Sequence, residues 1–405
     1  MEIKEEREGL LQRVRVLDLA DEKASYCSKL LADLGASVIK IEKPGGDPSR
    51  QLGPFFGSSP SPEGSLFFWH CNTNKQGVTL DIEKEEGKEL FLRLLKTADV
   101  VVESFDPGYL QKLGLGFDVL SVKNPRLILA SVTGFGQTGP RSHYKSSDLV
   151  ASAFAGQMFV SGSPSTPPLK PYGEQSSYVT SLFSAIAVLL ALRKRRLTGK
   201  GEHIDVSSQE CVASTLDHVL VRYFYDHVIP GRNGSVSWNN GSFILPCKDG
   251  HIHLAITTQW DTLVEWMAAE GMAEDLTDEN WKDETHRLKN IDHVMHVLRS
   301  WTQTHTVQEL FELGQALRFS WAPVSSPEEV LKSPQLEARD FFIDVDHPEL
   351  GRPMKYPGAP YKFCPPFAKK WKRAPLVGED NVRIYRDELG LSAEDLERLS
   401  SMNVI

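Results

Sequence analysis

Short apolar segments alternate with amphipathic segments along the first half of the chain, and this alternation restricts the possible folds more than any other feature. The apolar segments are rich in β-branched residues, which is typical of buried strands. The predicted strands are Val14–Leu19, Ser37–Ile41, Val100–Val102, Leu127–Val132 and His203–Val206. Helices are predicted between them at Ala24–Leu34 and Glu85–Lys96. This order predicts an α/β fold in which helices cover both faces of a mostly parallel sheet.

Two longer helices are predicted before the last of these strands, at Ser147–Val160 and Ser176–Arg196. The second carries few charges before Arg193, which predicts that it is buried. Its basic end, Arg193–Arg196, suits a helix C-terminus, where cations complement the helix dipole. A further helix is expected from Ser208.

The character of the chain changes from about Asp226. The stretch 231–241 (GRNGSVSWNNG) is rich in Gly, Asn and Ser, which predicts a long loop. Two alternating segments, 242–246 and 251–256, flank the turn CKDG and predict a β-hairpin. Helices are expected near 259–270, 291–303 and 306–317. Together these elements predict a small α+β domain.

The bulk composition excludes several classes of protein. The 405 residues carry a net charge of −9 with both signs interspersed, whereas a nucleic-acid binder needs a basic face. No apolar run reaches the roughly 18 residues of a membrane span, and the charged N-terminus lacks the apolar core of a signal peptide. The five cysteines are scattered without C-x-x-C spacing. We therefore expect a cytoplasmic protein with reduced thiols and no metal site.

The segment Gly134–Gly139 (GFGQTG) is a G-x-G-x-x-G motif that follows an apolar strand. In a dinucleotide site, the third glycine opens a helix whose N-terminus holds the pyrophosphate. Here Pro140, Arg141 and Ser142 follow instead, with no helix expected until about Ser146. The motif is therefore interpreted as a loop rather than as an NAD site.

Several longer stretches occur in an order that is much more specific. Residues 14–50 end in the pattern E-[KR]-P-x-G-D-x-x-R, and residues 72–140 run from NTNKQGVTLD to GFGQTGP. Residues 172–211 form a small-residue helix that ends in Ala-Leu and is followed by T-G-K-G and a strand. Together with the closing segment, these stretches resemble the class III CoA-transferases, the family of formyl-CoA transferase and α-methylacyl-CoA racemase.

The resemblance implies a class III CoA-transferase fold with a Rossmann-like large domain and a smaller α+β domain. The expected boundaries are 1–225 for the first part of the large domain and 226–334 for the small domain. Residues 335–405 would then return to the large domain. In this family two chains interlock, so a large obligate interface is also implied.

The resemblance also implies that a reactive residue is missing. The family's nucleophilic aspartate lies fifteen residues before the leucine of the Ala-Leu pair, and counting back from Leu192 gives Ser177. These enzymes move CoA between two carboxylic acids through acyl-aspartate and aspartyl-CoA intermediates. A serine would form a less activated ester and would need a general base. No G-x-S-x-G elbow surrounds Ser177, so we expect no catalytic residue at this position.

Two other carboxylates could replace the aspartate. Glu174 lies three residues upstream, and Asp148 aligns with a family position that often bears an acid near the active site. Each also has a structural interpretation, because acids near a helix N-terminus complement the dipole or cap the helix. The racemase branch uses a histidine just before that acid, where this chain has Ser147. Racemase activity is therefore not expected.

A groove for CoA is the second implication of the resemblance. The phosphates of CoA need Lys or Arg, and six residues match family positions that contact CoA. The candidate CoA-binding residues are Lys43, Arg50, Leu80, Phe105, Lys112 and Lys145. Arg50 could hold either a phosphate or its own loop. Glu83 departs from the family, which often has a lysine there, and Ser104 replaces a family asparagine.

An intact scaffold without its nucleophile predicts a division of labour. Some family members are heteromers in which one subunit bears the aspartate and a related subunit lacks it. The resemblance extends to heteromers that use succinyl-CoA as donor and benzylsuccinate as acceptor. We therefore expect a homologous, aspartate-bearing partner, with the CoA thioester as substrate and no permanently bound cofactor. A self-sufficient transferase and a CoA-binding scaffold without turnover are the alternatives.

Overall fold

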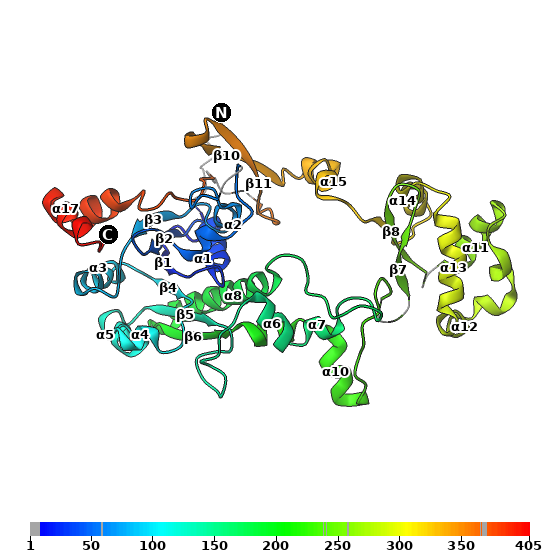
Figure 1. Ribbon diagram of the computed structural model, residues 1–405, viewed down its shortest axis with the longest axis horizontal. Helices are drawn as coiled ribbons and strands as arrows, with labels where there is room; N and C mark the ends of the chain where they lie inside the picture. The colour runs from blue at the N-terminus through cyan, green and yellow to red at the C-terminus, as the bar shows by residue number, and fades with distance from the viewer. Residues whose placement is uncertain are drawn as a thin grey trace. The chain divides into compact units, whose positions relative to one another are not determined.

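The computed structural model describes residues 9–57, 60–237, 239, 241–256, 259–364, 366 and 371–405. Contacts divide the chain into two compact units (Figure 1). The first comprises Met1–Gln157, Lys170–Val221 and Asp340–Ile405, and the second comprises Met158–Leu169 and Arg222–Arg339. The small domain expected at 226–334 lies inside the second unit, which also takes in the short segment 158–169.

A six-stranded parallel sheet forms the centre of the first unit, in the order β3-β2-β1-β4-β5-β6. The strands are β1 (Arg15–Leu19), β2 (Ser37–Glu42), β3 (Gln76–Thr79), β4 (Val100–Glu103), β5 (Ile128–Thr133) and β6 (Glu202–Ser207). The order reverses between β1 and β4. In sheets of this kind, a crevice opens at the carboxyl ends of the strands beside the reversal, and ligands bind there.

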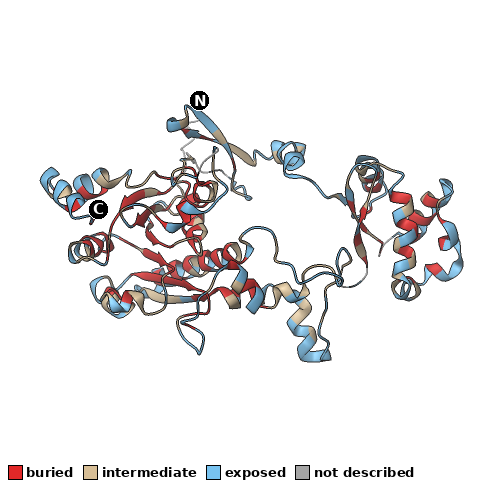
Figure 2. Ribbon diagram, viewed as in Figure 1, coloured by how far each residue is buried: buried red, intermediate tan, exposed pale blue. Residues whose placement is uncertain are grey.

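Helices cover both faces of this sheet, as its buried strands require (Figure 2). One face packs against helices of the first half of the chain and against the C-terminal segment. These are α3 (Glu85–Leu95), α4 (Tyr109–Lys112), α5 (Phe117–Lys123), η5 (Val382–Glu388) and α17 (Ala393–Ser401). The other face packs against α1 (Ser25–Asp33), α8 (Gln175–Thr198) and α9 (Ser208–Ser214). The sequence therefore predicted the layers correctly.

Helix α8 is buried on one side only. Its small residues, among them Ala185, Val188 and Ala191, pack into the core beneath the sheet. The opposite side exposes large apolar side chains, namely Leu182, Phe183, Ile186 and Leu190. By length and composition α8 could cross a membrane, but half of its apolar window is buried within the protein. The packing identifies α8 as a core helix with an uncovered apolar side.

The helix expected at 147–160 is two helices, which corrects the sequence prediction. Helix α6 (Asp148–Phe154) ends before Gly156, and α7 (Gln157–Val160) follows it. Gly156 has φ of +89°, a left-handed conformation that interrupts a right-handed helix and that glycine adopts without strain. Gly156 therefore serves the break between α6 and α7 rather than a close packing contact.

An antiparallel hairpin that the sequence did not indicate packs on the first unit. Its strands are β10 (Phe342–His347) and β11 (Arg352–Pro357), and its apolar side covers α2 (Leu66–Cys71). Phe68 and Trp69 are buried in this contact. These two aromatic side chains therefore form part of the core beneath the hairpin.

The second unit has its own core around the sheet β7-β8-β9. The strands are β7 (Ser242–Pro246), β8 (His251–Ala255) and β9 (Ala322–Pro323). The helices are α11 (Trp260–Ala269), α12 (Glu284–Lys289), α13 (Ile291–Thr302) and α14 (Val307–Ala316), followed by α15 (Pro327–Leu331) and α16 (Pro334–Ala338). Helix α10 (Asp217–Asp226) spans the boundary between the units.

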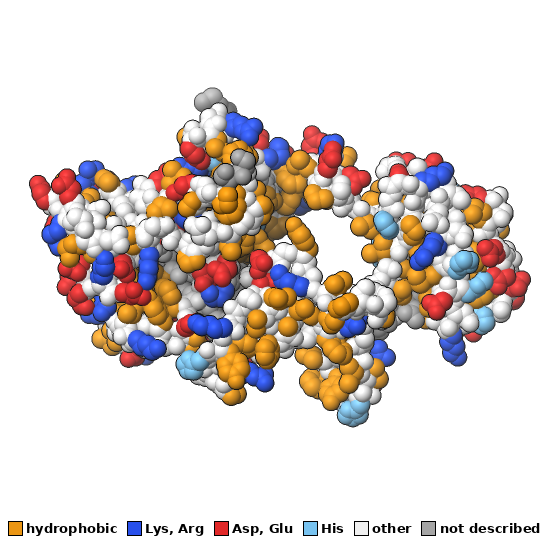
Figure 3. Space-filling model, in the orientation of Figure 1, with side chains coloured by type: hydrophobic (Ala, Val, Ile, Leu, Met, Phe, Trp, Pro, Cys, Tyr) orange, Lys and Arg blue, Asp and Glu red, His pale blue; other side chains and the backbone are white. Residues whose placement is uncertain are grey.

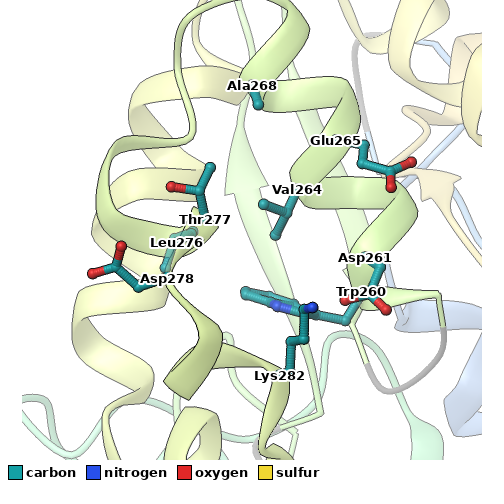
Figure 4. A pocket seen from close by; sticks show the side chains of 9 residues that line it. All are labelled: Trp260, Asp261, Val264, Glu265, Ala268, Leu276, Thr277, Asp278 and Lys282. Carbon is teal, nitrogen blue, oxygen red and sulfur yellow. The ribbon is translucent and has the colours of Figure 1, made fainter.

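A cavity of about 290 Å³ lies in the second unit beside α11 (Figure 4). Trp260, Val264 and Leu276 line it together with acidic side chains and Lys282. The described lining of this cavity includes none of the predicted site residues.

Buried ion pairs hold the carboxyl ends of β1 and β2 in the first unit. The ammonium of Lys75 lies 2.8 Å from the carboxylate of Asp18, and both side chains are fully buried. Lys75 also donates to the carbonyl of Ser25 and to the side chains of Ser28 and Asn72. A buried charge is tolerated only when it is paired and its remaining hydrogen-bonding capacity is satisfied. This site meets both conditions.

Replacing Lys75 by Met should lower the free energy of unfolding by about 3–5 kcal/mol, because the Asp18 carboxylate would be left buried and unpaired. Lys88→Met is the matched control, since Lys88 pairs with the exposed Glu85; its effect should stay within about 0.5 kcal/mol. Urea unfolding of both variants measures the difference. Equal losses would contradict the structural role of the buried pair.

Candidate CoA groove and acyl-transfer site

A groove of about 480 Å³ opens at the carboxyl ends of β1, β2 and β4. Its position follows from the strand order, because the two halves of the sheet diverge on either side of β1 and β4. The apolar wall consists of Leu19, Ile41, Leu80, Ile82 and Phe105. Such a wall with charged residues at its edge suits a ligand that combines a flat ring with phosphates.

Three of the six predicted CoA residues, Lys43, Leu80 and Phe105, line this groove. Leu80 follows β3 and is buried. The Phe105 ring lies 4.5 Å from that of Tyr109, measured between centroids. Tyr109 also lines the groove; its place there was not predicted, because it depends on the turn between β4 and α4.

The ammonium of Lys43 lies 2.9 Å from the carboxylate of Glu83. The hydroxyl of Tyr109 donates a hydrogen bond of 2.7 Å to the same carboxylate. The hydrogen bonds from Tyr109 and Lys43 lower the pKa of Glu83 below its ordinary value. Glu83 is therefore ionised at neutral pH, and Lys43 already has an anionic partner.

A second, smaller cavity of about 220 Å³ shares Lys23, Ser104, Phe105 and Asp106 with the groove. Its lining is rich in hydroxyl groups, which come from Ser104, Thr133, Ser142, Tyr144 and Ser146. Lys145 lines it and forms an ion pair of 2.6 Å with Asp106. The hydrogen bond from Lys145 lowers the pKa of Asp106.

The remaining two candidates lie outside both linings. Lys112 ends α4 and is exposed, and it lines neither cavity. Arg50 is buried, and its guanidinium binds the Glu42 carboxylate at 2.6 and 2.8 Å. It also donates to Glu63 and to the carbonyl of Pro375. The sequence left two roles open for Arg50, binding a phosphate or holding its own loop. These contacts agree with the second role.

The expected position of the family nucleophile, Ser177, lies in the first turn of α8. Ser177 is buried, and its backbone N–H donates a 3.0 Å hydrogen bond to the carboxylate of Asp148. Asp148 begins α6 and is also buried. Its other oxygen lies 2.9 Å from the ammonium of Lys170. Asp148 therefore stabilises the start of α8, where a negative charge complements the helix dipole.

Glu174 is the N-cap residue of α8, although its side chain forms no capping hydrogen bond. One of its oxygens lies 3.5 Å from the ammonium of Lys170. Lys170 thus contacts both carboxylates that could replace the aspartate, Asp148 and Glu174. Burial lowers the pKa of Lys170, but these contacts outweigh it and raise the pKa. Lys170 was not identified from the sequence, because only the folded loop before α8 brings it to Asp148.

The glycine motif 134–139 forms a loop, as expected. The backbone N–H of Gln137 donates to both carboxylate oxygens of Asp205, at 3.0 Å each. Among the described residues no helix begins between this loop and Asp148. The loop is held by β6 and does not lead into a helix N-terminus that could bind a pyrophosphate.

Glu103, at the end of β4, is a buried acid directly before two groove residues. It accepts a hydrogen bond of 2.7 Å from the backbone N–H of Phe105. Burial raises the pKa of Glu103 to about 7, although hydrogen bonds from Ser131 and Phe105 oppose the shift. Ser131 in turn lies 2.9 Å from the imidazole of His203. The charge of Glu103 therefore changes near neutral pH.

The model of CoA-transferase family III matches residues 11–381, and the chain belongs to this family. Subunit BbsE of succinyl-CoA:(R)-benzylsuccinate CoA-transferase from Thauera aromatica is 35% identical over 402 residues, 97% of each chain. The beta subunit of succinyl-CoA–L-malate CoA-transferase from Chloroflexus aurantiacus is 32% identical over 406 residues, 98% of each chain.

A solved structure supports the same assignment. The crystal structure of a CAIB/BAIF family protein from Brucella suis matches with a TM-score of 0.86 and 30% identity. The match covers 95% of this chain and 100% of that chain. The predicted family and fold class are therefore confirmed, and the chain is a class III CoA-transferase.

The raised pKa of Glu103 predicts a dependence of stability on pH. The folded pKa of about 7 exceeds the ordinary value of 4.5, so the folded state binds the proton more tightly than the unfolded state does. This contribution to stability is fully present below pH 4.5 and is lost as the pH rises to about 7. Glu103→Gln, which cannot ionise, should therefore become progressively more stable than the wild type between pH 4.5 and pH 8.

Thermal unfolding of both proteins across this pH range measures the difference. Glu89→Gln is the control, because Glu89 lies exposed on α3. Parallel pH profiles for wild type and Glu103→Gln would show that Glu103 ionises normally in the folded protein.

Proposed function

We propose that this chain is the subunit of a heteromeric class III CoA-transferase that lacks the nucleophilic aspartate, and that a homologous subunit supplies it. The observation that carries the proposal is the first turn of α8, where Ser177 occupies the expected position of the nucleophile. A carboxylate there would form an acyl anhydride as reactive as a thioester, which keeps each transfer step reversible. A serine ester would not be activated in this way.

The contacts of Asp148 and Glu174, the two carboxylates that could replace the aspartate, argue against a self-sufficient enzyme. Asp148 is buried, accepts the Ser177 N–H and pairs with Lys170. Attack on a thioester would require its carboxylate to leave both partners and would expose the start of α8. Glu174 is more accessible, but it lies outside the helix and shares the same lysine. Neither acid is free to act as nucleophile in this arrangement.

The exposed side of α8 provides a surface for the partner. Leu182, Phe183, Ile186 and Leu190 all lie on this helix and are at least 41% exposed. Apolar side chains also gather elsewhere on the face drawn in Figure 3. Apolar patches of this kind are typical of interfaces between subunits. In the family that this chain resembles, two chains interlock. A second class III chain, interlocked with this one in the same way, would cover the exposed side of α8.

The proposed substrates are succinyl-CoA as donor and benzylsuccinate as acceptor. The similarity to subunit BbsE, over 97% of both chains, supports this assignment. The relative from Chloroflexus aurantiacus is also named as a subunit of an enzyme that uses succinyl-CoA. The donor is therefore shared by both relatives, whereas the acceptors differ. A CoA-binding scaffold without turnover is the alternative from a different functional class.

Co-expression tests the proposal. The chain is purified alone and together with its nearest genomic homologue that has Asp at the Ser177 position, and CoA transfer from succinyl-CoA to benzylsuccinate is measured. We expect turnover only with the pair, because this chain has no residue that can carry the acyl group. Turnover by this chain alone would contradict the proposal. Inactivity of a stable, correctly folded pair with any dicarboxylic acceptor would favour the scaffold.

A further inference from the structure

Every lysine in the groove and the adjoining cavity is paired with an acid that lines the same space. Lys23 pairs with Asp21, and Lys145 pairs with Asp106. Lys43 pairs with Glu83. The other two acids of the groove are also paired, because Glu42 binds Arg50 and Asp47 binds Lys40. Among the described lining residues, no cation is left without an acidic neighbour for an incoming phosphate.

Of these pairs, Lys43–Glu83 lies beside the apolar wall. A ligand phosphate that binds there would have to separate Lys43 from Glu83. Both residues line the groove next to Leu80 and Ile82. The side chains of Lys43 and Glu83 are 52% and 46% exposed, so water and ligands reach them. By contrast, Lys40 is fully buried under Asp47 and cannot turn outward.

Three contacts fix Glu83 in this position. The Tyr109 hydroxyl and the Lys43 ammonium hold the carboxylate. Its backbone N–H donates 3.1 Å to the side chain of Asp81 in the turn before α3. Glu83 is therefore held at the groove edge as an ionised group rather than moving freely in solvent.

A carboxylate held there opposes phosphate binding in two ways. It occupies the ammonium of Lys43, which a phosphate would otherwise use as a point charge. It also repels the phosphate directly, since like charges a few ångströms apart at a protein surface interact unfavourably. Neither effect acts on the uncharged pantetheine part of CoA.

We propose that Glu83 is a specificity-determining residue that lowers the affinity of this chain's groove for the phosphates of CoA by holding Lys43. The inference rests on the proposed function and deepens it. A subunit without a nucleophile that bound succinyl-CoA tightly would withhold the donor from the catalytic subunit. Weak binding in this groove leaves the donor available to the partner.

The test uses the full-length chain and isothermal titration with CoA at low ionic strength. Glu83→Gln keeps the shape of the side chain and a hydrogen-bond acceptor for Tyr109, but it removes the charge. We expect Glu83→Gln to bind CoA on the order of tenfold more tightly than the wild type, and Glu83→Lys more tightly still. The gain should shrink as salt is added, because the groove edge is exposed.

Two controls isolate the electrostatic effect. Glu85→Gln removes the same charge from α3 outside the groove, where Glu85 pairs with Lys88, and it should leave CoA affinity unchanged. Pantetheine, which lacks the phosphates of the nucleotide, should bind all four proteins alike. Circular dichroism confirms that the variants are folded.

The proposal is overturned if Glu83→Gln and Glu83→Lys show no gain in CoA affinity, whether they bind as weakly as the wild type or do not bind at all. An equal gain with Glu85→Gln would also overturn it, since the effect would then be one of net charge. These outcomes are separate from the co-expression result. A pair that turns over while Glu83→Gln gains nothing keeps the proposed function and removes only this inference.

Discussion

The first unit depends on buried ion pairs at and near the candidate CoA groove. The three pairs, each with one member on β1 or β2, are Lys75 with Asp18, Lys40 with Asp47 and Arg50 with Glu42. Each pair ties a loop to the sheet, and Arg50 also reaches the C-terminal segment at Pro375. Because a buried charge without its partner is strongly destabilising, these pairs fix the loops in one arrangement. The groove has a defined shape for this reason.

The same chemistry accounts for the two departures from the family pattern that the resemblance implies. At the start of α8 a carboxylate is present, but it comes from Asp148, where it stabilises a helix N-terminus and pairs with Lys170. At the groove edge a lysine is present, but Glu83 holds it. In both places a charge that could act on substrate acts on the protein instead. Under the proposed function, a subunit that only positions the active site of its partner requires no more than this.

Much of the fold could be predicted from the sequence, because its strands are short, apolar and bounded by clear turns. The absence of the nucleophile stays a prediction, which rests on the distance of Ser177 from the Ala-Leu pair. The hairpin β10–β11 could not be predicted, because its strands alternate weakly and are stabilised by α2, which lies far away in the sequence. The contacts of Lys170 and Tyr109 were missed for the same reason. Pairings between distant segments leave no local periodicity.

The most direct test of the account is the location of the acyl intermediate. The co-expressed pair is incubated with succinyl-CoA, the activated carboxylate is trapped with hydroxylamine, and the labelled peptide is identified by mass spectrometry. The account predicts a hydroxamate on the aspartate of the partner subunit and none in this chain. A hydroxamate on Glu174 or Asp148 would show that the nucleophile has moved within this chain, and the division of labour between subunits would be wrong.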